Sequence, residues 1–171
     1  MVVKPKRFHL AQANVARMRG PLDSRIMEGF RSQLDRINAI ADASPGFVWR
    51  LQTNEGNATA TRAYDDDRIL FNMSVWESLE ALHRYVYRSD HAGLLRNRRE
   101  WFEPVAGPIL VLWWIAPGHV PSIEEAQARF AILKSRGPTA EAFTFRDPFP
   151  PPGHPRVPAP DTDAEFCDWA T

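Results

Sequence analysis

Residues 69–76 read ILFNMSVW, and this alternating stretch decides the fold class. Its odd-numbered positions are all apolar, whereas its even-numbered positions combine Leu70 and Trp76 with the polar Asn72 and Ser74. Side chains of an extended chain point alternately to opposite sides, so the two sets lie on different faces. The stretch therefore predicts a β-strand with one apolar face and one face that mixes aromatic and polar groups.

The segments on either side of this strand predict a mixed fold. Apolar residues spaced three or four apart indicate helices, whereas alternating or continuous apolar runs indicate strands. This reading gives the order βαββαβ, which predicts an α+β fold of the ferredoxin-like type, with helices on one face of a four-stranded antiparallel sheet. The predicted elements are a strand at 8–15, a helix at 22–41, strands at 47–52 and 69–76, a helical region at 77–102 that breaks near Ser89, and a strand at 109–116.

A further helix and a proline-rich tail follow the last predicted strand. Ser122 and Glu125 form a capping box, in which each side chain satisfies a backbone donor at the start of a helix. Beyond Asp147 the frequent prolines forbid regular structure. We therefore expect a barrel domain with a C-terminal helical extension over 1–147 and a mobile tail over 148–171. Three aromatic side chains are expected to hold the start of that tail against the body: Phe143, Phe145 and Phe149.

The composition excludes several classes of protein. The 171 residues include 21 Lys plus Arg and 21 Asp plus Glu, so the chain lacks the basic excess that favours nucleic-acid binding. The only cysteine, Cys167, rules out a disulfide within one chain, and no secretory signal follows the basic N-terminal residues. The longest apolar run, 109–116, is far shorter than the ~20 residues of a membrane-spanning helix. We therefore expect a cytoplasmic protein that contacts neither nucleic acid nor a membrane.

The last predicted strand is apolar on both faces, which predicts a partner. Residues 109–116 read ILVLWWIA, so whichever side faces the helices, the opposite side presents large apolar groups. A ferredoxin-like sheet leaves that side open, and covering it at roughly 25 cal/mol per Å² of apolar area is worth several kcal/mol. A symmetric homodimer that closes a barrel is the expected cover. The alternative is that the C-terminal helix and the Phe-rich segment fold back over this side within one chain.

Several short stretches resemble known families. Residues 76–82, followed by Ser89-Asp90-His91, resemble the strand-to-helix signature of the dimeric α+β barrel superfamily, which includes cofactor-independent antibiotic-biosynthesis monooxygenases and haem-degrading monooxygenases. More closely, nearly everything from Phe8 to Pro150 resembles an uncharacterised bacterial family of domains of unknown function (DUF3291). That resemblance implies the fold and no function. It is carried by WRLQ at 49–52, SVWES at 74–78, REWF at 99–102, LWW at 112–114, PGH at 117–119, GPT at 137–139 and AFTF at 142–145.

The superfamily resemblance implies two kinds of site. Haem-degrading relatives use an Asn on the first strand with a Trp and a His on the helix after the third strand. Only Asn14 fits this set, unless His83 or His91 binds iron in a shifted register. Monooxygenases that act on polycyclic phenols hold their substrate with Asn, Trp and Tyr side chains, and no bound cofactor is expected. Five residues supply those types here: Asn14, Asn72, Trp76, Tyr85 and Tyr87.

Three ring side chains recur at every fourth position in the second helical region. An unbroken helix would place His83, Tyr87 and His91 on one face, where they could bind a ligand, relay protons or hold a metal. A His titrates near pH 6.5, so His83 suits a general acid or base. The alternative is that His83 lies on the helix surface or in a satisfied core. Because no Asp or Glu stands three or four residues after His83, we expect no metal site.

Tryptophans in or beside the strands supply flat apolar walls of the kind that surround aromatic ligands. Polar residues at inward strand positions, among them Gln12 and Ser74, need partners, and a bound ligand is one. The leading hypothesis is a cofactor-independent monooxygenase for a small aromatic or polycyclic ligand. The alternatives are a haem-binding protein and a non-catalytic binder or scaffold, in which the aromatic residues only fill the core. The expected ligand-binding residues are Trp49, Asn72, Trp76, Tyr85, His91, Trp113 and Trp114, and the expected catalytic residues are His83, Tyr87 and Asn14.

Overall fold

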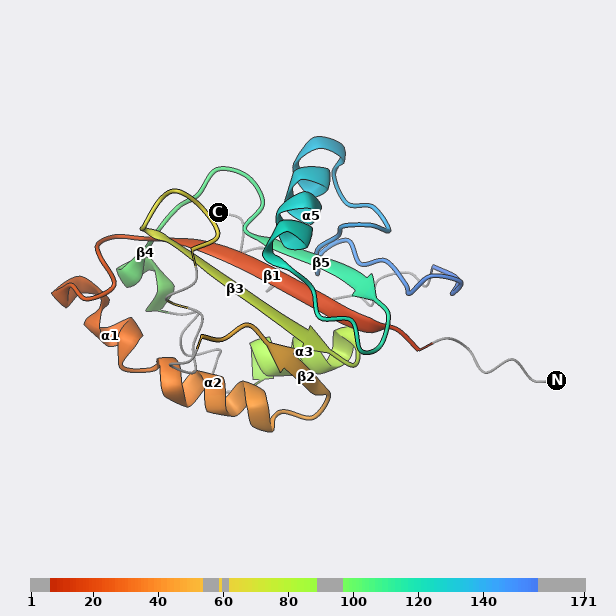
Figure 1. Cartoon of the computed structure of the whole chain (residues 1–171), viewed down its shortest axis with the longest axis horizontal. Helices are drawn as coiled ribbons and strands as arrows, with labels where there is room; N and C mark the ends of the chain where they lie inside the picture. Colours follow the sequence, from red (N-terminus) through yellow and green to blue (C-terminus); the bar gives the residue numbers. More distant parts are fainter. Residues whose placement is uncertain (1–6, 54–58, 60–61, 89–96, 157–171) are drawn as a thin grey trace.

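A computed structural model of the chain describes residues 7–53, 59, 62–88 and 97–156 (Figure 1). Within these ranges no helix is both long enough and apolar enough to cross a membrane. Besides a helical stretch at 97–101, the elements are β1 (His9–Met18), η1 (Arg25–Met27), α1 (Glu28–Arg31), α2 (Leu34–Ala43), β2 (Phe47–Arg50), β3 (Ile69–Trp76), α3 (Leu79–Arg88), β4 (Phe102–Glu103), β5 (Leu110–Ile115) and α5 (Ile123–Arg136).

The strands form one antiparallel sheet in the order β2-β3-β1-β5. The short strand β4 adds to it by pairing with the last two residues of β1. Strand β3 is inserted between β1 and β2, which are joined by the first helical region, and β5 lies on the far side of β1. This is the strand order of a ferredoxin-like fold, so the predicted α+β class is confirmed.

The helix predicted over 22–41 is interrupted and consists of three pieces, η1, α1 and α2. The side chains of Ser32 and Gln33 both donate hydrogen bonds to the carbonyl oxygen of Gly29, at 3.1 and 2.9 Å. In a regular helix that oxygen would accept the backbone N–H of Gln33. This N–H instead donates to the carbonyl of Phe30, one residue closer. Side-chain competition for a backbone carbonyl therefore ends α1 early.

Helices cover the sheet on both sides (Figure 1). The even-numbered residues of β1, β3 and β5 point toward α3, and we call this side the α3 face. The odd-numbered residues point toward α5, and we call this side the α5 face. The buried side chains of α5 that pack on the sheet are those predicted from its spacing: Ala126, Phe130 and Leu133. On the sheet they meet a wholly apolar set that includes Ala11, Ala13, Phe71, Met73, Val75, Val111, Trp113 and Ile115.

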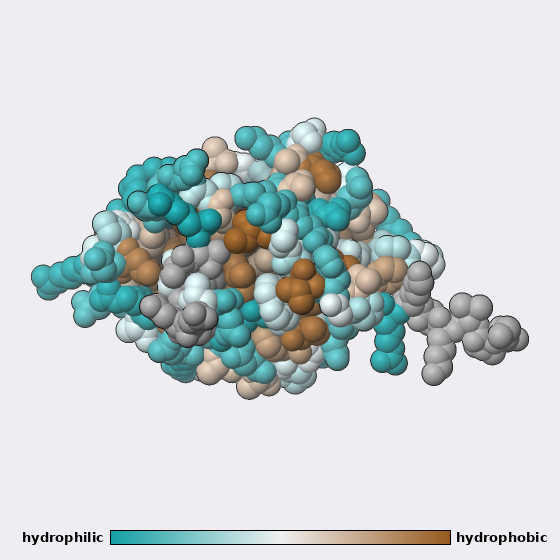
Figure 2. All heavy atoms as spheres, viewed as in Figure 1, coloured by the Kyte–Doolittle hydropathy of each residue, from teal (hydrophilic) through white to brown (hydrophobic). Residues whose placement is uncertain are grey.

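The apolar side of the sheet is therefore not open, and the reason given for a second copy is wrong. Within one chain, α5 helps to bury Val111 and Trp113 completely. The alternative, in which the C-terminal helix and the Phe-rich segment fold back over this side, is found in part: α5 covers it, whereas the rings of Phe143 and Phe145 pack on the α3 face. Figure 2 shows the remaining apolar atoms in this view as separate patches among hydrophilic residues. The homodimer stays a prediction, without the support of an uncovered face.

The Phe-rich segment after α5 lies along the outer edge of β5. The backbones of Leu112 and Phe143 exchange two hydrogen bonds, of 2.8 and 2.9 Å. The rings of Phe143 and Phe145 then pack on the α3 face. Further along, Trp114 Nε1 donates to the carbonyl oxygen of Phe149 at 2.8 Å. These contacts confirm that aromatic residues hold the start of the proline-rich segment against the body.

Candidate functional site

Two polar rows cross the α3 face between apolar rows. Gln12 lies opposite Ser74, and Asn14 lies opposite Asn72, in the register of β1 and β3. Gln12 and Ser74 are buried, whereas Asn14 is half-buried and Asn72 is exposed. The polar side chains therefore extend from the interior toward the surface. Among the described residues, Gln12 and Ser74 are the only polar ones that are buried.

Hydrogen bonds join these side chains to Trp76 in one chain, which we call the amide chain. Trp76 Nε1 donates to Ser74 Oγ at 2.9 Å, and Ser74 Oγ donates to Gln12 Oε1 at 2.8 Å. Gln12 Nε2 then donates to Asn14 Oδ1 at 2.7 Å. Because Trp76 is fully buried, the amide chain begins in the core and ends at Asn14. It supplies the partners without which buried polar atoms would destabilise the fold.

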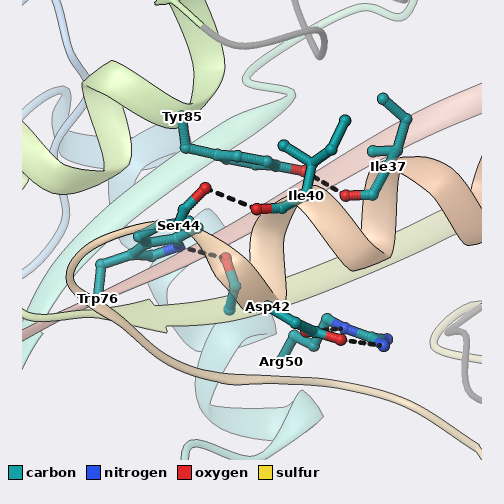
Figure 3. Close-up of polar contacts among 8 residues, drawn as sticks. Ile37, Ile40, Asp42, Ser44, Arg50, Trp76 and Tyr85 are labelled. Carbon is teal, nitrogen blue, oxygen red and sulfur yellow. Dashed lines mark hydrogen bonds and ion pairs between the residues drawn. The ribbon is translucent and has the colours of Figure 1, made fainter.

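Tyr85 of α3 covers the indole of Trp76. Their ring centroids lie 5.0 Å apart, with 25° between the ring planes. Figure 3 shows the Tyr85 ring above α2, where its hydroxyl lies 3.5 Å from the carbonyl oxygen of Ile37. Burial raises the pKa of the Tyr85 phenol, which the nearby Arg50 lowers and Asp42 raises to lesser extents. The phenol therefore stays protonated at neutral pH and forms an aromatic wall rather than a base.

An ion pair fixes α2 beneath that wall. Arg50 Nε and Nη2 donate to the two carboxylate oxygens of Asp42, at 2.7 and 3.1 Å (Figure 3). The Arg50 side chain is only 12% exposed but that of Asp42 is 47% exposed, so the two parallel bonds fix the geometry while water still reaches the carboxylate. The Ser44 hydroxyl donates to the carbonyl oxygen of Ile40 at 2.7 Å and closes the end of α2. These contacts hold α2 in place beside the stacked rings of Trp76 and Tyr85.

His83 and Tyr87 form a second cluster, toward the C-terminal segment. Their ring centroids lie 4.7 Å apart, which confirms that they share one face of α3. Phe145 packs edge-on against both rings, at 6.0 and 5.9 Å, and His83 Nε2 and the Tyr87 hydroxyl are buried. The amide chain reaches Asn14 without involving either residue. Their catalytic role stays a prediction, and His91 lies outside the described residues.

The four strand tryptophans do not line one site. Trp76 and Trp114 lie on the α3 face, whereas Trp49 and Trp113 pack on the α5 face. Trp113 is fully buried, and its Nε1 donates to Glu125 Oε1 at 2.8 Å. Neighbours in a strand point to opposite sides, so Trp113 and Trp114 are separated by the sheet itself. The structure therefore does not bring Trp49 and Trp113 to the amide chain.

Sequence reasoning missed two features of this site. It expected Gln12 and Ser74 to need partners, but did not join them to Trp76 and Asn14 in one series of hydrogen bonds. The alternation of 69–76 places Ser74 and Trp76 on one face, but the position of Gln12 opposite Ser74 depends on the register between two strands, which has no local sequence signal. It also left Phe145 out of the site, because contact between the C-terminal segment and α3 follows from tertiary packing and has no local sequence signal.

The arrangement suits a flat organic ligand better than a metal. Among the residues that the structure describes, no three His, Cys, Asp or Glu side chains gather closely enough to hold a metal ion. The α3 face instead combines aromatic surface with amide groups near its edge. Rings contribute apolar contact area, and a few placed polar groups orient a ligand.

Solved structures that are similar to this chain share little sequence with it. SnoaB, a cofactor-independent oxygenase from Streptomyces nogalater, is 19% identical over 67% of this chain and 99% of its own, with a TM-score of 0.43. A monooxygenase from the gene ActVA-Orf6 of Streptomyces coelicolor, in complex with Nanaomycin D, is 17% identical over 70% and 96%, with a TM-score of 0.40. PA3566 from Pseudomonas aeruginosa is 12% identical over 68% and 100%, with a TM-score of 0.44. The fold assignment rests on the strand order of this chain.

A family profile gives a stronger match than these structures. No curated protein matches the sequence. The profile described as "Domain of unknown function (DUF3291)" matches residues 9–159, which is most of the chain. The family expected from short stretches such as WRLQ and SVWES is thereby confirmed. The chain belongs to this family of domains of unknown function.

Proposed function

We propose that the protein binds a small aromatic or polycyclic ligand on the α3 face and oxidises it with O₂ without a bound cofactor. Asn14 and Asn72 contact an oxygen of the ligand, Tyr85 and Trp114 provide aromatic surface on the same face, and the buried Trp76 supports the amide chain from the core. The observation that carries this proposal is the amide chain, which brings buried hydrogen-bonding groups from the core to the half-buried Asn14.

A fold of this kind does not need polar groups at those positions. On the α5 face of the same strands, the residues that are buried are all apolar. Burying an amide or a hydroxyl costs about 1–3 kcal/mol when no partner is supplied. Here the amide chain supplies those partners. A fully paired polar set that leads from the core toward an accessible amide supports a binding function.

The chemistry required of the protein is modest. Oxidation of a CH₂ group between two aromatic rings by O₂ follows CH₂ + O₂ → C=O + H₂O, so the substrate supplies all four electrons and no further reductant is needed. The slow step is loss of a proton to give an electron-rich enolate or phenolate. An amide N–H that donates to the ligand oxygen stabilises the negative charge that develops there. His83 or Tyr87 is the proposed group that moves the proton, because each carries a buried polar atom on α3.

Anthrone is a suitable probe, because it contains such a CH₂ group and its oxidation product is anthraquinone. We expect protein-dependent O₂ uptake above the rate in buffer, with one anthraquinone formed for each O₂ consumed. Asn14→Ala should lower the rate by about 10- to 100-fold, the effect of losing one hydrogen bond to a developing charge. Asn97→Ala is the matched control, because Asn97 is an exposed asparagine outside the site.

Three outcomes separate the candidate functions. Binding of anthrone without O₂ uptake would indicate a non-catalytic binder. An unchanged rate in Asn14→Ala would remove the proposed role of the amide. Haem addition is expected to leave the haem absorption band unshifted, because His83 Nε2 is buried beside Tyr87 and Phe145.

A further inference from the structure

We infer that the amide chain is a one-way series of donors that fixes the Asn14 amide with its NH₂ group toward the ligand. Gln12 and Ser74 are then positioning residues, and the site selects ligands that present a hydrogen-bond acceptor, such as a carbonyl, quinone or phenolate oxygen. This inference rests on the proposed function for the identity of the site. It goes further by naming the ligand class and the residues that determine it.

The buried end of the amide chain, at Trp76, determines which group donates in each of its hydrogen bonds. An indole N–H can only donate, so Trp76 Nε1 must donate to Ser74 Oγ across their 2.9 Å separation. Trp76 is 0% exposed, and Tyr85 covers its ring. Water therefore does not replace Ser74 as the acceptor. The hydroxyl of Ser74 accepts this hydrogen bond through its oxygen and still has its own O–H to donate.

In the middle of the amide chain, the donor and acceptor roles of Ser74 determine the orientation of the Gln12 amide. Ser74 is 8% exposed, and its hydroxyl proton needs an acceptor within the protein, which is Gln12 Oε1 at 2.8 Å. Turning the Gln12 amide around would place its NH₂ against Ser74 Oγ and take that acceptor away. Gln12 therefore keeps its oxygen toward Ser74 and its nitrogen toward Asn14. Buried unsatisfied groups cost about 1–3 kcal/mol, which is enough to favour one orientation strongly.

The end of the chain determines what a ligand meets. Asn14 Oδ1 accepts from Gln12 Nε2 at 2.7 Å, so the NH₂ of Asn14 occupies the other branch of the amide. Among the described residues, the structure gives this NH₂ no protein acceptor. Asn14 is half-buried, and its register partner Asn72 is exposed on the same face. A ligand that enters at this row therefore meets a fixed donor in Asn14, and an adaptable amide in Asn72.

Gln12→Glu tests the direction, because it changes the chemistry and keeps the shape. At pH 8 a carboxylate can accept from Ser74, but it cannot donate to Asn14 Oδ1. The Asn14 amide should then turn its NH₂ toward Glu at position 12 and its oxygen toward the ligand. In side-chain amide NMR spectra of the free protein, we expect the Asn14 NH₂ to exchange with water quickly in wild type and at least about tenfold more slowly in the variant. Gln52→Glu, an exposed glutamine with the same change of charge, should leave Asn14 unchanged.

Ligand binding gives the second readout. Naphthoquinone has only acceptor oxygens, whereas naphthylamine presents a donor on a similar ring system. Wild type should bind naphthoquinone more tightly, and Gln12→Glu should weaken it by about tenfold while leaving naphthylamine unchanged or tighter. Equal loss of both ligands, or slow exchange of the Asn14 amide already in wild type, would overturn the inference. If neither ligand binds while the exchange pattern is as expected, the proposed function fails and the orientation of Asn14 is upheld.

Discussion

The two faces of the same strands differ in what they can do. On the α5 face every buried side chain of the strands is apolar, and the helix that covers it lies within the chain. On the α3 face two rows are polar, and they lie between the apolar rows of Trp76 and Leu70. This difference indicates different roles for the two faces. The α5 face contributes mainly to stability, whereas the α3 face presents hydrogen-bonding groups in place of some apolar contacts.

The largest expected effect comes from adjacent residues on the two faces. Trp113→Ala should lower the free energy of unfolding by about 4 kcal/mol, because it empties a fully buried site and removes the bond to Glu125. Trp114→Ala should cost about 2 kcal/mol, since Trp114 is only half-buried. Urea unfolding of both variants measures the two values. A larger loss for Trp114 would contradict the expectation that the α5 face contributes more to stability at this point of the sheet.

The packing of α3 over the polar rows gives the next largest effect. Gly46 has φ +85°, and a Cβ built on it would lie 2.6 Å from the Cβ of Ala81 in α3. Gly46→Ala should therefore cost about 3 kcal/mol, from backbone strain and from displacement of α3. Gly118→Ala is the matched control, because its φ is +83° and a Cβ there meets nothing within 4 Å. It should cost about 1 kcal/mol in the same urea experiment, and equal losses would show that contact with Ala81 is unimportant.

Much of the fold could be predicted because local sequence patterns determine its individual elements. The alternation of 69–76, the apolar run at 109–116 and the capping box at Ser122 each specify one element. The surface that receives α5 could not be predicted in this way. The apolar stripe of α5 shows that one side of this helix is buried. A second copy of the protein and the sheet of the same chain would bury that stripe equally well. Only the tertiary structure shows that the sheet of the same chain is the partner.

The candidate site could be predicted only in part, for a similar reason. The parity of Asn72 and Trp76 placed them on one face from sequence alone. In β5 both sets of positions are apolar, so parity could not show whether Trp113 or Trp114 faces α3. Trp49 and Trp113 were therefore grouped with residues from which the sheet separates them. Patterns assign faces well where the two faces differ in polarity, and poorly where they do not.

Removing the middle of the amide chain should have a smaller effect on stability. Ser74→Ala leaves the indole N–H of Trp76 and the amide oxygen of Gln12 without their partner, which should cost about 1–2 kcal/mol. Ser135→Ala, on the exposed side of α5, should change stability by less than about 0.5 kcal/mol. Urea unfolding compares the two. If Ser74→Ala were as stable as wild type, the hydrogen bonds of the amide chain would contribute nothing to the native state.

The smallest expected effect lies at the rim of the α5 face, where Glu125 accepts bonds from Trp113 and from His119 Nε2, the latter at 2.7 Å. Burial alone would raise the pKa of Glu125, but hydrogen bonds from His119 and Trp113, and the positive charge of Arg129, bring it below its ordinary value. A carboxyl whose pKa is depressed by folding stabilises the protein above its unfolded pKa, and that contribution disappears as the pH falls through the lower, folded pKa.

The contribution of Glu125 should therefore be present at pH 6 and lost as the pH falls through the lowered pKa of the folded state, at less than about 1 kcal/mol because the group is partly exposed to water. Unfolding by urea at pH 6 and at pH 3 should show a smaller acid loss in Glu125→Gln than in wild type. The same loss in both would mean that the ion pair is immaterial. A carboxylate at the rim anchors α5 at little cost, because water still reaches it, whereas the polar groups inside the α3 face must be paired completely. That contrast is why the buried polar groups, and not the rim carboxylate, indicate the functional side of the sheet.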